Sequence, residues 1–478
     1  MEWTGLALLI LVGVGIISTG LPAAFILIAV ASIGALLGLA TQTIPLSLLG
    51  ALPSRLINLF DNDLLQALPL YVTMGLLLGR LPVADALYRT SNALMPKHGS
   101  AVSGMLLGAL LGPMNGSVGA SVLGLTRVVA PRLNAEGVAP ATRDAVIAVA
   151  STLGVLVPPS LVLILLSDAM LSAHTTAVTA TGRMDRVINT QDVFHAALLP
   201  AGIFLLLCIA LAWHAGHGEN LPARAREPVT PQQIALAAFA LFSLLILLGG
   251  VATGYFYAVE AAAMGAFALL AGGLLSGRLR GAVMREVLHD AIAITGALFA
   301  LLIAATTFTL VLRLLGTDKL VTNLVGAIPG GDIPAVAVVL GVIGLCAFVL
   351  DAFEIIFVIV PIIIPPLLIR VADARWVAVL VLLTLQSSFL LPPFGYALMM
   401  VRGATKNPAP FRAFVRALMP FLVAQWMLLI LVLLAPKLVH FGENAAESTR
   451  NLAAPVSSEQ IDKLMRDMIP APPAYEPK

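Results

Sequence analysis

The chain has 478 residues, of which 59% are hydrophobic and 11% are charged, and its mean hydropathy is +1.00. This composition excludes a water-soluble globular protein, and a formal net charge of +2 without a basic face argues against nucleic acid as a partner. The apolar stretches lack the alternation of lipid-facing β-strands, which excludes a β-barrel. We therefore expect an all-α polytopic membrane protein that spans a lipid bilayer.

Apolar segments long enough for a membrane helix recur along the chain, since about 20 helical residues cross the hydrocarbon core. No basic stretch precedes the first segment, so we expect it to be retained rather than cleaved as a signal peptide. Cys208 and Cys346 lie in apolar runs without metal-ligand spacing, so we expect no transition metal. The expected segments lie near residues 3–18, 21–40, 59–79, 141–172, 193–213, 233–250, 256–277, 288–313, 376–401 and 413–440.

Two further apolar segments, 100–131 and 334–370, are interrupted by polar residues. Residues Gly112–Gly119 break the first segment, and Asp351–Glu354 break the second. Non-helical backbone at membrane depth is tolerated only where it is buried in protein or lines a cavity. The interruptions therefore predict two re-entrant helical hairpins.

Motifs in the two halves of the chain recur at an offset of 234 residues. At this offset Ser117 corresponds to Asp351, and the Pro-Pro pair at 158–159 corresponds to the pair at 392–393. A lone Pro-Pro pair is compatible with a kinked helix that has no other role. Its recurrence at matching positions instead indicates broken helices around a midplane binding site, as in secondary transporters.

Basic residues predict how the segments cross the membrane, because short cytoplasmic loops are rich in Lys and Arg. One threading places every strongly basic loop inside, including those around Arg127, Arg278 and Arg402. In this threading the two hairpins enter the membrane from opposite faces. The halves are therefore expected to form an inverted repeat.

The hairpins and the Pro-Pro-broken helices are expected to move together as one transport body, because they share buried polar backbone. The other helices are expected to supply a fixed frame. The expected regions are an N-terminal scaffold (1–99), the first hairpin and broken helix (100–172), a central scaffold (173–333), the second hairpin and broken helix (334–402), a C-terminal membrane helix (403–441) and a polar, proline-rich tail (442–478).

Asp351 is the most informative ionisable residue, because a carboxylate inside the membrane is unfavourable unless it meets a cation, water or a hydrogen-bond network. At a hairpin tip, Asp351 either faces water or binds a coupling cation such as sodium. Glu354 lies one helical turn later and either supports such a site or is solvated. The residue types leave these alternatives open.

The first interruption also carries oxygen ligands suited to a hard cation. Asn115, Ser117 and Ser121 offer side-chain oxygens, and Gly116 lets backbone groups approach closely. Small residues at this position alternatively serve only close helix packing. A cation site here would pair with the one at Asp351.

The Pro-Pro pairs free backbone groups on both of their sides. The carbonyls of Gly154 and Val157 precede the first pair, where proline lacks the N–H that a helix would supply. The half-helices after Pro159 and Pro393 direct partial positive charge toward the midplane. This arrangement favours an anionic substrate.

Several ordered motifs carry a resemblance to a known family: Gly116–Ser121, Gly154–Ser160, Tyr257–Ala262, Phe348–Asp351 with Pro361, and Leu391–Gly395. Together they resemble the large membrane (permease) subunit of TRAP (tripartite ATP-independent periplasmic) transporters. The resemblance runs from about residue 5 to residue 440.

The resemblance implies an elevator-type sodium symporter in the bacterial inner membrane, with sodium as the coupling ion and no cofactor. It implies two protein partners, a small TRAP membrane subunit and a periplasmic substrate-binding protein that delivers a small organic anion. We expect sodium ligands at Asn115, Gly116, Ser117, Gly154, Val157, Pro159, Asp351, Ser388, Pro392 and Gly395, and substrate contacts at Ser121, Ser160 and Pro393.

Other classes of function fit the sequence less well. An intramembrane protease needs paired carboxylates or a motif such as HExxH, and neither is present in the apolar runs. Channels obtain their pore from rings of subunits, whereas two broken hairpins in one chain suit alternating access. A stand-alone sodium-coupled carboxylate carrier, working without a binding protein, remains the main alternative.

Overall fold

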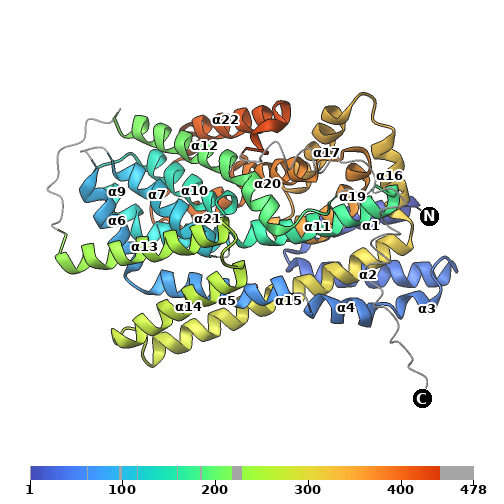
Figure 1. Cartoon of the computed structure of the whole chain (residues 1–478), viewed down its shortest axis with the longest axis horizontal. Helices are drawn as coiled ribbons and strands as arrows, with labels where there is room; N and C mark the ends of the chain where they lie inside the picture. The colour runs from blue at the N-terminus through green and yellow to red at the C-terminus, as the bar shows by residue number, and fades with distance from the viewer. Residues whose placement is uncertain are drawn as a thin grey trace, which may run out of the picture.

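The computed structural model describes residues 2–61, 63–95, 99–115, 117–158, 160–183, 186–217, 229–393 and 395–441. Within these ranges the regular elements are all helices, which confirms the predicted all-α class (Figure 1). The expected tail at 442–478 lies outside the described residues.

The described helices fall into two halves of the chain. The first half contains α1 (Glu2–Thr19), α2 (Ala23–Ala40), α3 (Leu46–Leu49), α4 (Leu52–Phe60), α5 (Asp63–Arg80), α6 (Val83–Leu94), α7 (Ser100–Leu111), the short helix η1 (Gly112–Asn115), α8 (Val118–Val128), α9 (Ala130–Ala135), α10 (Pro140–Leu156), α11 (Leu161–Thr181) and α12 (Thr190–His217). The second half contains α13 (Pro231–Ala252), α14 (Ala258–Leu275), α15 (Ala282–Leu314), α16 (Thr317–Gly326), α17 (Asp332–Cys346), α18 (Ala352–Glu354), the π-helical turn η2 (Ile355–Ile359), α19 (Val360–Arg370), α20 (Ala374–Leu390), α21 (Tyr396–Ala404), α22 (Phe411–Leu434) and η3 (Pro436–Leu438).

Eight stretches of the described helices are long and apolar enough to cross a membrane. A ninth arises if α5 and α6, which are bent by 62° at their junction, count as one span. The eight stretches are Ala23–Ala40, Pro140–Thr181, Thr190–Ala215, Pro231–Ala252, Ala258–Leu275, Ala282–Leu314, Ala352–Arg370 and Phe411–Leu434.

The offset of 234 residues also relates helix boundaries in the two halves. Helices α10 and α20 begin and end at positions related by this offset, and both are 17 residues long. The residues that follow them, Val157 and Leu391, share an extended backbone with φ −78° and ψ 117°. The Pro-Pro pairs therefore end both helices in the same way, because a proline cannot continue the helical hydrogen-bond ladder.

The same relation holds for helices that the apolar pattern did not predict. Arg80 ends α5 and Leu314 ends α15, while Val83 begins α6 and Thr317 begins α16. The apolar segments expected from the sequence do not include the region of α6 or of α16. Both are short and amphipathic, so the charged residues on their exposed faces interrupt any apolar run.

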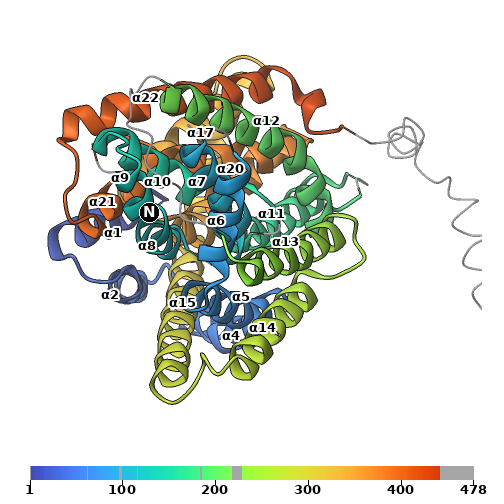
Figure 2. The ribbon, with the colours of Figure 1, turned by 90° about the vertical axis from the view of Figure 1, so that its left-hand side faces the viewer.

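Packing separates a central group of helices from a peripheral one. Helices α10 and α20 are buried almost throughout and contact each other at the centre of the molecule. This position agrees with their sequences, in which apolar residues occur on every face of each helix. Helices α2, α4, α5, α14 and α15 form the peripheral group along one side of the molecule (Figures 1 and 2).

Helix α12, which covers residues 193–213 of the expected central scaffold, lies apart from the peripheral group. It packs against α7, α10, α20 and α22. Both views place α12 and α22 on the side of the molecule opposite α14 and α15 (Figures 1 and 2). The sequence missed this grouping because an apolar helix does not reveal which neighbours it packs against.

Candidate functional site

The first interruption contains the start of α8, and Ser117, a predicted site residue, caps this helix. Ser117 has an extended backbone and precedes α8, and its Oγ accepts a hydrogen bond from the Ala120 N–H at 3.1 Å. The hydroxyl of Ser121 donates to the Ser117 carbonyl at 3.2 Å. Serine is favoured at such N-caps because it satisfies a backbone N–H that the helix leaves unpaired.

The second interruption is capped in a corresponding way by Asp351. Its Oδ1 accepts a hydrogen bond from the Ala352 N–H at 2.8 Å. Glu354 Oε2 accepts one from the Asp351 N–H at 3.1 Å, which completes a reciprocal capping box. Asp351 and Ser117 therefore hold equivalent positions in the two halves, and Glu354 supports the tip that carries Asp351.

The first Pro-Pro break exposes carbonyl groups beside the first interruption. Pro158 has no N–H to donate to the Gly154 carbonyl. The Val155 carbonyl lacks its usual helical donor for the same reason. The Ser160 hydroxyl donates a hydrogen bond to this carbonyl instead, at 3.0 Å. Ser160 also caps α11 by accepting from the Leu163 N–H at 3.0 Å. Ser160 is thus held in place by two hydrogen bonds at the break.

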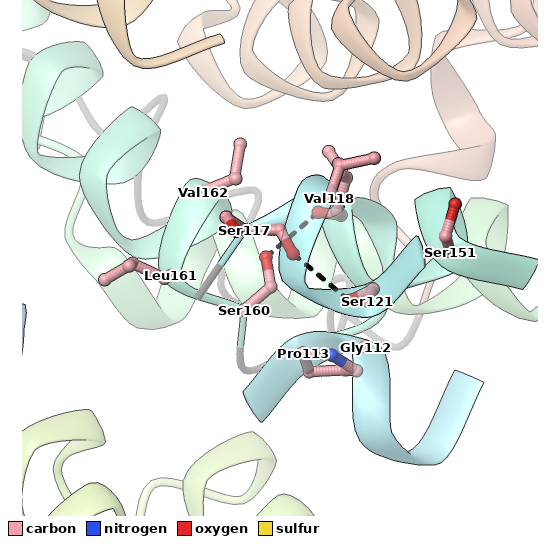
Figure 3. Close-up of a pocket in the computed structure, with 11 residues that line it drawn as sticks. Gly112, Pro113, Ser117, Val118, Ser121, Ser151, Ser160, Leu161 and Val162 are labelled. Carbon is pink, nitrogen blue, oxygen red and sulfur yellow. Dashed lines mark hydrogen bonds between the residues drawn. The ribbon is translucent and has the colours of Figure 1, made fainter. Parts of the chain in front are cut away.

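These groups line a small cavity of about 10 Å³ between η1, α8, α10 and the start of α11. A space of this size holds about one water-sized sphere. Four hydroxyl residues line it, namely Ser117, Ser121, Ser151 and Ser160. In Figure 3, Ser117, Ser121 and Ser160 cluster together and Ser151 lies to one side of them. The sequence prediction missed Ser151, although it lies one helical turn before Gly154 on α10.

A close approach between two glycines shapes the same cavity. A Cβ atom on Gly154 would lie 2.2 Å from the carbonyl carbon of Gly112. No side chain fits at that distance, so the backbone of α10 touches the backbone of η1 directly. Glycine at both positions therefore permits the contact that brings the cavity residues together.

Tyr396 joins the two halves of the candidate site and was also missed from the sequence. A Cβ atom on Gly119, in the first turn of α8, would lie 2.7 Å from the Tyr396 hydroxyl oxygen. Tyr396 begins α21 and packs its ring on Phe389, with 6.3 Å between the ring centroids. It therefore lies where the first interruption and the second Pro-Pro break approach one another.

The remaining predicted residues belong to the second break or fall outside the described part. Ser388 precedes Pro392 as Gly154 precedes Pro158, and its carbonyl accepts from the Leu391 N–H at 3.3 Å. Asp351 and Val157 are not among the residues that line the small cavity. The rest of the predicted set consists of Pro392 and Pro393 in the loop after α20, Gly395 capping α21, Asn115 at the end of η1, and Gly116 and Pro159, which both lie outside the described residues.

The sequence matches the family described as "Tripartite ATP-independent periplasmic transporter, DctM component" over residues 10–438. The sialic acid TRAP transporter permease protein SiaT of Haemophilus influenzae is 21% identical over 83% of this chain, which spans only 62% of that protein. The C4-dicarboxylate TRAP transporter large permease protein DctM of Pseudomonas aeruginosa is 24% identical over 81% of this chain and 87% of its own length.

Solved transporter structures share the fold. The YdaH transporter of Alcanivorax borkumensis matches with a TM-score of 0.63 at 13% identity, over 81% of this chain and 87% of its own. MtrF of Neisseria gonorrhoeae matches with a TM-score of 0.53 at 12% identity, over 81% of this chain and 83% of its own. Together with the family match over residues 10–438, these findings show that the chain is a multi-pass membrane protein and belongs to the large membrane subunits of TRAP transporters.

Proposed function

We propose that the chain is the carrier of a sodium-coupled uptake system for a small organic anion in the bacterial inner membrane. The observation that carries this proposal is the pair of repeat-related helix starts, one capped by Ser117 and one by the carboxylate of Asp351. Two interruptions that present oxygen atoms beside two broken helices are the arrangement that a midplane ion and substrate site requires. The names of the relatives, which concern sialic acid and C4-dicarboxylates, support an organic acid as substrate.

One sodium ion would bind at the first break. The hydroxyls of Ser117 and Ser160 and the carbonyl of Gly154 surround a space of about 10 Å³, which suits a small hard cation with oxygen ligands. Asn115, Gly116, Val157 and Pro159 complete the proposed backbone and side-chain ligands at this break.

A second sodium ion would bind at Asp351 in the other half. Ser388, Pro392 and Gly395 supply the accompanying oxygen atoms, mainly from carbonyls that the Pro-Pro break frees. The substrate anion would lie between the two breaks, near Ser121, Ser160 and Pro393. The positive ends of the half-helices that follow the breaks would attract its charge.

The movement that carries the substrate would be an elevator motion of the central helices against the peripheral ones. The packing of α12 and α22 on α10 and α20 supports their inclusion in the moving body. The peripheral helices α2, α4, α5, α14 and α15 would form the fixed frame. The small membrane subunit would extend this frame, and a periplasmic binding protein would deliver the anion.

Uptake into proteoliposomes tests the proposed class of function. The chain is reconstituted with its small membrane subunit, and uptake of a radiolabelled organic acid is followed with and without the binding protein under an inward sodium gradient. We expect uptake only when the binding protein is present. Equal uptake without it would instead identify a stand-alone carboxylate carrier.

A further inference from the structure

An apolar groove lies between the peripheral helices α5 and α14 and their neighbours α6 and α13, and it shares no residue with the proposed transport site. It has a volume of about 230 Å³ and is formed by α5, α6, α13 and α14. The residues that line it include Leu78, Val83, Leu244, Leu269 and Gly272. None of the residues that line it belongs to the proposed ion or substrate sites.

The size of the groove indicates what kind of molecule fits it. A membrane helix is a cylinder about 10 Å wide and 30 Å long, so its volume exceeds that of the groove roughly tenfold. An apolar cavity of about 150 Å³ holds one six-carbon ring in a protein interior. By proportion, about 230 Å³ accommodates roughly nine carbon atoms, which is about half of an acyl chain.

A positive charge lies at one end of the groove. Arg278, in the loop between α14 and α15, lines the groove and is exposed. Its side chain has no hydrogen bond or ion pair with the residues that the structure describes. Arg80, at the end of α5, is by contrast held by ion pairs with Glu286 and Asp290. Arg278 is therefore the cation at this end of the groove that remains available to an anionic group.

We propose that the groove binds one acyl chain of an anionic phospholipid, whose phosphate is held by Arg278. Basic pockets between membrane helices on the cytoplasmic side recognise such headgroups. The loop that carries Arg278 is cytoplasmic in the threading that places basic loops inside. This lipid site is independent of the transport proposal, because none of the residues that line the groove belongs to the proposed ion or substrate sites.

The chain offers variants that fill the groove without disturbing its walls. Gly272 lines the groove and a Cβ atom on it meets no other atom within 4 Å, so Gly272→Leu adds apolar volume at the groove with no contact to hinder its Cβ. Gly249→Leu on α13 is the matched control, because it is equally unobstructed and does not line the groove. Arg278→Gln removes the headgroup contact, and Arg285→Gln on α15 removes an equal charge elsewhere.

Native mass spectrometry of the purified full chain measures retention of phosphatidylglycerol against phosphatidylcholine. We expect one phosphatidylglycerol bound to the wild type and to both controls, and none bound to Gly272→Leu. Arg278→Gln should weaken the binding of phosphatidylglycerol about fivefold, which is the effect of one basic residue on an anionic lipid. It should leave the binding of phosphatidylcholine unchanged.

Three results would overturn the lipid site. Equal lipid retention by Gly272→Leu and Gly249→Leu would show that the acyl chain lies elsewhere. Equally weakened phosphatidylglycerol binding in Arg278→Gln and Arg285→Gln would show that the effect comes from overall charge. The third result has two parts: the lipid is lost when the chain is co-purified with the small membrane subunit, and Gly272→Leu no longer forms that complex. It would show that the groove is a protein interface.

Discussion

Val157 and Leu391 end their helices with the same backbone torsions, φ −78° and ψ 117°, although 234 residues separate them. Each is followed by a Pro-Pro pair, and each pair leads to a second half-helix. The half-helix of one half of the chain packs on the helix that follows the interruption in the other half, since α11 contacts α19 and α21 contacts α8. The two breaks are therefore built as one unit from both halves of the chain.

The contact between Gly112 and Gly154 predicts a strong effect of one methyl group. Gly154→Ala would place Cβ 2.2 Å from a backbone carbon of Gly112, so α10 must move away from η1. Overpacking of this kind destabilises a protein by about 1–3 kcal/mol. We expect a lower unfolding temperature in detergent and a loss of most transport activity. Gly124→Ala on α8 meets open space and is the control, with unchanged or slightly raised stability.

The close approach of Tyr396 to Gly119 predicts that a substitution at Tyr396 compensates for one at Gly119. Gly119→Ala brings a methyl group to 2.7 Å from the Tyr396 hydroxyl oxygen, and the next atom is 3.4 Å away on Met400. Tyr396→Phe removes that oxygen and keeps the ring contact with Phe389. The double variant should therefore regain most of the stability and uptake that Gly119→Ala loses. Additive losses in a double-mutant cycle would show that the two residues are not in contact.

The proposed elevator motion predicts different effects of two cysteine pairs. A Cβ atom on Gly344 of α17 would lie 3.8 Å from Cγ2 of Thr384 on the central helix α20. One on Gly13 of α1, which packs on the frame helix α2, would lie 3.9 Å from Cγ1 of Val349 beside the second interruption. Both spacings suit a short thiol cross-linker. In a background without Cys208 and Cys346, cross-linking Gly344→Cys to Thr384→Cys should leave uptake intact. Cross-linking Gly13→Cys to Val349→Cys should arrest it, and the opposite pattern would favour local gating.

A contact between the start of α20 and the segment that follows η3 predicts a pH effect on stability. Asp373 caps α20 and accepts hydrogen bonds from the Trp376 N–H at 3.0 Å and from His440 Nε2 at 2.7 Å. Burial alone opposes ionisation, but the hydrogen bonds from His440 and Trp376 outweigh it, so the pKa of Asp373 lies below its ordinary value. The contact therefore stabilises the fold fully above about pH 3.9, the pKa of Asp373 in the unfolded chain. This stabilisation is lost as the pH falls through the lower pKa of Asp373 in the folded protein.

Replacement of the histidine tests this pH dependence. In His440→Gln the pKa of Asp373 should rise toward its ordinary value, so the loss of stability on acidification begins at a higher pH than in the wild type. Unfolding temperatures measured in detergent between about pH 6 and pH 3 report the shift. His289→Gln, at an exposed position on α15, should follow the wild-type curve. Identical curves for both variants would show that His440 does not hold Asp373 ionised.

The sequence predicted those parts of the structure that depend on local chemistry. The Pro-Pro pairs marked the breaks because proline cannot continue a helix, and the polar residues around Ser117 and Asp351 marked both helix starts. Ser151 and Tyr396 escaped notice because their roles depend on contacts with distant segments. The short helices α6 and α16 also escaped notice, since their charged faces hide them from a search for apolar runs.

Sodium binding to the purified protein tests the central claim most directly, because it requires neither substrate nor partner proteins. Asp351→Asn keeps a good N-cap for α18 but removes the charge. The sodium affinity of this variant should fall about tenfold or more, since a contact to a charged group is worth about 1.5–3 kcal/mol. Asp332→Asn at the start of α17 should bind sodium like the wild type. Wild-type sodium affinity in Asp351→Asn, with its unfolding temperature unchanged, would contradict the assignment of the coupling site to this pair of breaks.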